Sequence, residues 1–101
     1  MGLDMYVCTV EKGKEKTEPL FEIEYWRKQW FLHKLFVKYV QGGNDDCNTY
    51  RVSELALRQI IEDVKIADVP LELSDKIIEQ LINIIRTIDT RKYTIMYYSS
   101  W

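Results

Sequence analysis

The aromatic side chains of this chain gather in a few segments and leave one long region empty. Seven of the thirteen lie between Phe21 and Tyr39, four lie in the last nine residues, and none lies between Arg51 and Lys92. Aromatic side chains bury large areas and dominate hydrophobic cores. We therefore expect the aromatic segments to share one layer of the core, and the region without aromatic residues to supply a second, aliphatic layer.

The two ends of the chain have the pattern of β-strands. In "LDMYVCTV" (3–10), apolar side chains at positions 3, 5 and 7 alternate with a mixed set at positions 4, 6 and 8. This alternation places the two sets on opposite faces of a strand. The final segment "KYTIMYYSSW" (92–101) is also rich in strand-forming residues, and "TYRV" (49–52) predicts a short third strand. We expect the two terminal strands to pair with each other.

Three further segments have helical patterns. The first runs from about 22 to 41 and ends at a pair of glycines, the second runs over about 54–67 after the N-cap residue Ser53, and the third is capped by Ser74. The fold class predicted is α+β, a small antiparallel sheet with paired N- and C-terminal strands packed with about three helices. The length of the chain, residues 1–101, suits a single domain.

His33 is the only histidine, and it falls near the centre of the apolar side of the first predicted helix. A buried imidazole must pair both ring nitrogens or lose roughly 1–3 kcal/mol for each unsatisfied group. In one interpretation His33 is a core residue that ties the helix to the sheet, with Gln29 as one partner and a strand residue or a loop carboxylate as the other. In the alternative it binds a ligand or acts as an acid or base.

A second polar cluster, Asp45-Asp46-Cys47, follows the pair of glycines. Its acidic residues favour a turn in which a carboxylate accepts a hydrogen bond from the nearby backbone, although a ligand site shared with His33 is the alternative. Cys8 and Cys47 are expected to be free thiols in a reducing cytoplasm. The cysteines and His33 lack the spacing of a metal site, and the common catalytic motifs are absent. We therefore predict no metal, no cofactor and no catalytic residue.

The polar side of the first predicted helix carries a candidate surface for binding a partner protein. Phe31 and Leu35 fall among basic residues, and an exposed apolar pair with a basic rim has the composition of a binding hot spot for an acidic partner. In the alternative, other helices cover Phe31 and Leu35, which then belong to the core. The residues of this surface are Arg27, Lys28, Phe31, Lys34, Leu35 and Lys38.

Composition argues against several classes of function. The formal net charge is -2 and the pI is about 5.4, whereas dedicated nucleic-acid-binding proteins usually show a clear basic excess. No apolar stretch approaches the roughly 20 residues of a membrane-spanning helix, and the first residues lack the pattern of a signal peptide. We expect a cytoplasmic protein that binds neither nucleic acid nor membrane.

Short motifs along the chain resemble a family of short, uncharacterised phage and prophage proteins. These motifs are "MGLDMY" at the start, "YWRK" followed by a histidine, "DDC", and "SSW" at the end. The middle of the chain departs from the family, whose members often have a longer segment rich in Tyr and Phe where this chain has only "DVPLEL". The matching residues are Gly2, Asp4, Met5, Tyr6, Trp26, Arg27, Lys28, His33, Asp46, Cys47, Ser99, Ser100 and Trp101.

This resemblance implies a phage origin, which suggests two functions of different classes. The first is a small interaction protein of the host cytoplasm that inhibits a host defence or regulatory protein, in the manner of anti-CRISPR proteins. The second is a small-molecule-binding domain or a small enzyme, with a polar site that the resemblance extends to the C-terminal tail. Its residues would be Asp4, His33, Asp46, Cys47, Ser99, Ser100 and Trp101, with Arg27 beside them.

Overall fold

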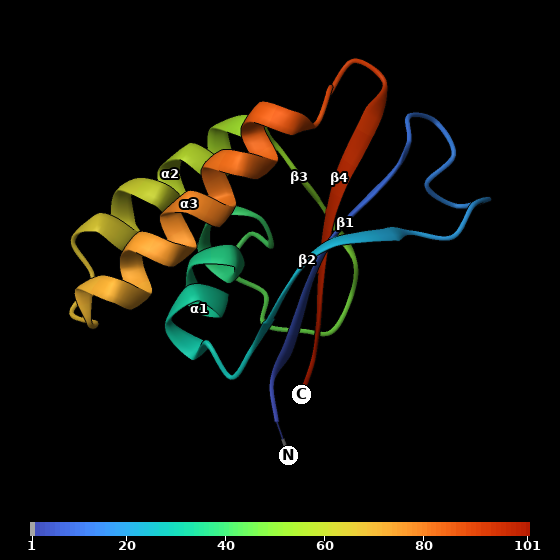
Figure 1. Cartoon of the computed structure of the whole chain (residues 1–101). Coiled ribbons are helices and arrows are strands. Elements are labelled where there is room, and N and C mark those ends of the chain that lie inside the picture. The colour runs from blue at the N-terminus through green and yellow to red at the C-terminus, as the bar shows by residue number, and fades with distance from the viewer. Residues whose placement is uncertain (1) are drawn as a thin grey trace.

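The computed structural model describes residues 2–101, so Met1 of the "MGLDMY" motif lies outside the described residues. Four antiparallel strands form one sheet in the order β2-β1-β4-β3, and three helices pack on one face of it (Figure 1). This is the predicted α+β class. The elements are β1 (Asp4–Glu11), β2 (Phe21–Arg27), α1 (Trp30–Tyr39), β3 (Tyr50–Val52), α2 (Glu54–Lys65), α3 (Leu71–Thr87) and β4 (Tyr93–Ser100).

The two terminal strands are neighbours in the centre of the sheet, as the sequence predicts. β1 and β4 pair over their whole length, from Asp4 opposite Ser100 to Glu11 opposite Tyr93. Met5, Val7 and Tyr97, which are all fully buried, point from these strands toward the helices. In the first half of β1, buried Met5 and Val7 alternate with the partly exposed Asp4 and Tyr6, which gives this part of the sheet one apolar face.

The prediction of a helix from residue 22 is wrong, because residues 21–27 form strand β2 beside β1. The segment "FEIEYWR" alternates apolar and acidic residues with a period of two, which is a strand pattern. Lys28 then adopts a positive φ of 59°, its N–H donates to the Leu3 carbonyl at 2.7 Å, and α1 begins only at Trp30. The sheet accordingly has four strands, one more than the sequence predicted.

An aromatic cluster joins the sheet to α1. The Phe36 ring of α1 stacks on the Tyr97 ring of β4, with ring centroids 4.0 Å apart and an angle of 7° between the ring planes. The ring centroids of Trp26 of β2 and Phe36 are 6.1 Å apart. Such pairs contribute beyond their buried area, by about 0.5–1.5 kcal/mol each. Helices α2 and α3 add aliphatic side chains to the core, including Leu57, Ile60, Ile77 and Leu81. The expected aromatic and aliphatic layers are both present.

Helix α2 starts where the sequence predicts, and helix α3 does not. The Ser53 side chain accepts a hydrogen bond from the Ala56 N–H at 3.1 Å, as an N-cap does. Helix α3 begins earlier than predicted, at Leu71 after Pro70. Pro70 is the N-cap residue of this helix, and its carbonyl accepts the first helical hydrogen bond from the Ser74 N–H at 3.1 Å. Ser74 thus lies inside the helix, where its hydroxyl donates to the Leu71 carbonyl at 3.0 Å.

The second face of the sheet carries no helix (Figure 1). We call it the open face. Tyr6 of β1 lies between Tyr25 of β2 and Tyr98 of β4 on this face, since both are its register partners. The strand register places eight further residues on the open face: Asp4, Cys8, Glu22, Arg27, Arg51, Thr94, Met96 and Ser100.

Candidate functional site

His33 is fully buried and pairs both of its ring nitrogens. Its Nε2 lies 2.8 Å from Oδ1 of Asp45, and its Nδ1 lies 2.6 Å from the hydroxyl oxygen of Tyr97. Because a carboxylate only accepts hydrogen bonds, we assign the proton to Nε2, and Nδ1 then accepts from the Tyr97 hydroxyl. The prediction of a buried, hydrogen-bonded His33 is confirmed. The expectation that Gln29 pairs with the ring is wrong, because its backbone carbonyl accepts only from the backbone N–H of His33, at 3.0 Å. The two ring partners are instead the strand residue Tyr97 and the loop carboxylate of Asp45.

Tyr97 remains neutral in this cluster. Burial raises the pKa of its hydroxyl far above the ordinary value of 10.0, and the nearby charge of Asp45 adds to the rise. A neutral hydroxyl keeps the proton that it donates to His33. The cluster of Asp45, His33 and Tyr97 therefore connects the loop after α1, the helix itself and the central strand β4 through two hydrogen bonds.

Two buried polar atoms next to this region have no hydrogen-bond partner within residues 2–101. They are the hydroxyl oxygen of Ser99 and the amide oxygen Oε1 of Gln41. Ser99 lies two residues after Tyr97 on β4, so both side chains point toward the helices. Ser99 therefore lies on the face of the sheet that His33 covers, but no hydrogen bond joins Ser99 to His33.

The carboxylate that contacts His33 belongs to Asp45, and the predicted Asp46 has a different role. Oδ1 of Asp46 accepts from the Asn48 N–H at 3.0 Å, and Oδ2 accepts from the Tyr50 hydroxyl at 2.7 Å. These bonds, first that of Tyr50, lower the pKa of Asp46. This is the turn interaction that the sequence favoured for the cluster. Cys47 is a free, exposed thiol in the same loop.

The remaining members of the predicted polar site do not gather around His33. Asp4 and Ser100 are register partners on the open face, whereas His33 lies under the helical face. Trp101 is 43% exposed at the end of β4. In the part of the chain from residue 2 onward, no three His, Cys, Asp or Glu side chains come together as a metal site. The predicted ligand site is therefore divided between the two faces of the sheet.

The main clefts of the molecule lie away from His33. The first is an open groove of about 440 Å³ between the strands and the end of α3, and its lining includes Val10, Ile23, Ile88 and Tyr93. None of the five main clefts of the described structure is lined by His33, Tyr97 or Asp45. Only the Asp45 side chain, which is 52% exposed, connects the buried cluster to solvent. This geometry suits a structural tie better than a substrate site.

The structure also revises the partner-binding surface that was predicted on the first helix. Arg27 ends β2 and Lys28 lies in the following turn, so neither belongs to α1. Phe31 and Leu35 are half-buried and pack against the hydrophobic core, which corrects the expectation of an exposed pair and fits the alternative. Lys34 and Lys38 are exposed, and Lys38 lies 3.8 Å from Asp63 of α2.

The open face instead presents three tyrosines in a row across neighbouring strands, a set we call the tyrosine row. The rings of Tyr6 and Tyr98 stack with centroids 4.7 Å apart and planes 16° apart, and Tyr25 lies 5.2 Å from Tyr6 at a tilt of 44°. The Tyr25 hydroxyl donates to Asp4, a bond that raises the pKa of Tyr25. Sequence reasoning missed this row because it assigned Tyr25 to a helix and expected the aromatic segments to share one layer of the core.

Comparison with known proteins adds no relative: no family model, curated protein or solved structure matches this chain. Among the described residues, none of the helices has the length and apolar composition needed to cross a membrane. The buried cluster and the open face are therefore interpreted from their geometry.

Proposed function

We propose that this chain is a small interaction protein that binds another protein through its open face. The observation that carries the proposal is the tyrosine row of Tyr6, Tyr25 and Tyr98 on a sheet face that no helix covers. Tyrosine is enriched at protein interfaces because its ring contributes apolar area and its hydroxyl contributes hydrogen bonds. Tyr25 is 39% exposed and offers its ring, and its hydroxyl, which donates to Asp4, can still accept a hydrogen bond.

The chemistry of the open face favours a protein over nucleic acid as the partner. Single-stranded nucleic acids bind sheets by stacking their bases on exposed aromatic ring faces within a basic groove. Here Tyr6 and Tyr98 stack on each other, so the two ring faces that meet are not available to stack on a base. The arginines of the face are already paired with acidic side chains, Arg27 with Asp4 at 3.9 Å and Arg51 with Glu15 at 3.3 Å.

We further propose that the partner is a host defence or regulatory protein and that binding inhibits it in the host cytoplasm. The support for this finer proposal is the resemblance of the terminal and central motifs to phage and prophage proteins, together with the mixed-charge surface of a small chain. The alternative of a small enzyme has less support, because His33 and Tyr97 are fully buried and paired with each other.

Two matched tyrosine variants test the proposal. Tyr25→Ala removes an exposed ring from the open face, and Tyr93→Ala removes a ring of similar exposure, 45%, from the helical side of the same sheet. The tagged parent chain is used to capture its partner from host lysate, and affinities of the variants are then measured with the purified partner. Tyr25→Ala should weaken binding about tenfold or more, as truncation of a hot-spot residue does.

The control should bind like the parent, and both variants should keep the parent's dispersed NMR spectrum. Equal affinity of Tyr25→Ala and the parent, or a loss confined to Tyr93→Ala, would contradict the proposal.

A further inference from the structure

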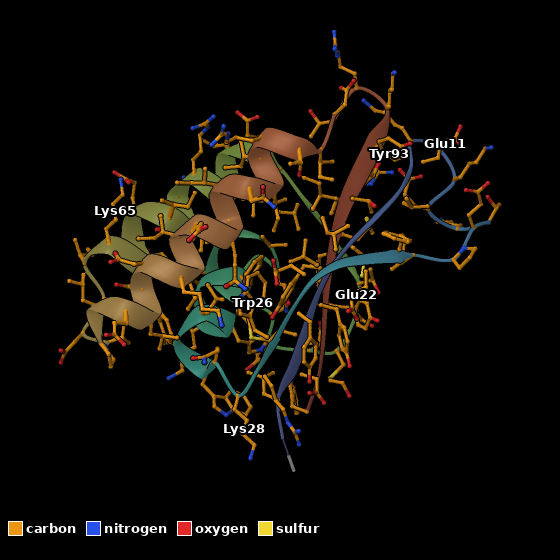
Figure 2. The ribbon with its side chains drawn as sticks, in the orientation of Figure 1. Glu11, Glu22, Trp26, Lys28, Lys65 and Tyr93 are labelled. Carbon is orange, nitrogen blue, oxygen red and sulfur yellow. The ribbon has the colours of Figure 1, made fainter. Side chains whose placement is uncertain are left out.

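A β-bulge in β2 sends two neighbouring glutamates to opposite faces of the sheet. The register with β1 shifts between Val7, which faces Glu24, and Cys8, which faces Glu22, so Ile23 is the extra residue. In a regular strand Glu22 and Glu24 would share a face. Here Glu24 turns toward the helices, where its Oε1 accepts from Nε2 of Gln80 at 3.1 Å. Glu22 lies on the open face, so it points to the other side of the sheet from Trp26 (Figure 2).

Among the charged residues that the strand register places on the open face, Glu22 has no ionic partner within the described residues. Asp4 pairs with Arg27 and Glu15 pairs with Arg51, and each pair is close to neutral. Within residues 2–101, no Lys, Arg or His nitrogen lies within 4.0 Å of the Glu22 carboxylate. Glu22 therefore places an uncompensated negative charge on the open face, and its side chain is exposed.

Glu22 lies beside the tyrosine row, because its register partner Cys8 is two residues after Tyr6 on β1 and pairs with Met96, two residues before Tyr98 on β4. Its charge helps to raise the pKa of the Cys8 thiol and of the Tyr98 hydroxyl, after the larger effect of burial on each. Tyr6 and Tyr98 stack directly beside this position, and their hydroxyls make no hydrogen bond to any described residue. Three groups that accept hydrogen bonds thus lie together on one surface: a carboxylate and two hydroxyls.

We propose that Glu22, Tyr6 and Tyr98 recognise an arginine side chain on the surface of the partner protein. The guanidinium group offers five N–H donors in a rigid plane, so one group can serve several acceptors at once. Its charge compensates that of Glu22, and charge-assisted hydrogen bonds are about twice as strong as neutral ones. This inference rests on the proposed function of the open face and names the chemistry of its partner.

The recognition is tested on the full chain with a small probe, N-acetyl-arginine methylamide. The neutral analogue N-acetyl-citrulline methylamide has nearly the same shape and serves as the control probe. In an NMR titration of the ¹⁵N-labelled chain, the arginine probe should shift the amides of Cys8, Glu22 and Tyr98 in a saturable manner, and citrulline should not. Glu22→Gln should abolish the shifts, and Glu24→Gln, which alters the other face, should retain them.

Equal shifts with the two probes, or shifts that persist in Glu22→Gln, would overturn the inference. The affinity assay with the purified partner separates this failure from failure of the proposed function. The inference expects Glu22→Gln and Tyr25→Ala each to weaken binding about tenfold or more. Loss of affinity in Tyr25→Ala alone would overturn arginine recognition and leave the open face as the binding surface. Parent-like affinity in both variants would overturn both proposals.

Discussion

At the scale of single residues, the structure separates side chains that hold the fold from side chains that are free to bind. His33 has both ring nitrogens paired inside the core, whereas Glu22 and Tyr25 have exposed side chains on the open face. A buried polar group stabilises the protein only while its partners are present, because an unpaired group retains its desolvation cost. The residues of the buried cluster should therefore affect stability, and those of the open face should affect binding.

His33→Ala should lower the free energy of unfolding by at least about 1–3 kcal/mol, because it leaves the buried Tyr97 hydroxyl without its acceptor. Urea unfolding at neutral pH measures the change. Asp45→Asn keeps the shape of the loop side chain and alters a half-exposed partner, so its cost should be smaller. A His33→Ala variant that unfolds like the parent but no longer binds its partner would show that the cluster belongs to the binding site.

The Cys8 thiol predicts a dependence of stability on alkaline pH. Burial, and to a smaller degree the charge of Glu22, raises its pKa from the ordinary value of 9.0 to about 11. A pKa that is higher in the folded state means that the unfolded chain loses its proton first as the pH rises. Stability should therefore decrease between about pH 9 and pH 11, and urea unfolding of Cys8→Ala should show a shallower decrease over this range. An equally steep decrease in that variant would argue against the burial of Cys8.

At the scale of elements, local patterns in the sequence were sufficient where a segment makes its own structure. The alternation in β1, the N-cap at Ser53 and the one-sided apolar pattern of α2 all identified their elements. Strand β2 was misassigned because "FEIEYWRKQWFLHK" passes from a period of two to a helical period without a break in polarity. Its hydrogen bonds come from β1, a distant segment, so the short period of two in residues 21–25 is the one local sign of the strand.

The two serines that the sequence predicted as N-caps, Ser53 and Ser74, test where helices α2 and α3 begin. Ser53→Ala removes the side-chain acceptor of the Ala56 N–H and should cost about 1 kcal/mol of stability. Ser74→Ala is the matched control, because Ser74 lies within α3, where alanine has the higher helix propensity. Its cost should be well below that of Ser53→Ala in thermal or urea unfolding. The reverse order would restore Ser74 as the cap of α3.

At the scale of the whole molecule, the asymmetry of the sheet is the feature that leads from fold to function. All three helices cover one face and the tyrosine row occupies the other (Figure 1). The sequence predicted the fold class and the pairing of the ends, since both follow from the apolar patterns of the strands. It did not predict the open face, because the side of the sheet on which a tyrosine lies depends on the register and on the bulge at Ile23.

Hydroxyl-radical footprinting of the chain, free and bound to its purified partner, tests the central claim most directly. The method reports the solvent exposure of individual aromatic side chains. Tyr25 is 39% exposed on the open face, while Tyr93 and Trp30 are each 45% exposed elsewhere and serve as internal controls. The open face as the binding surface predicts strong protection of Tyr25 in the complex, with unchanged oxidation of Tyr93 and Trp30. Protection of Tyr93 or Trp30 with unchanged oxidation of Tyr25 would contradict it.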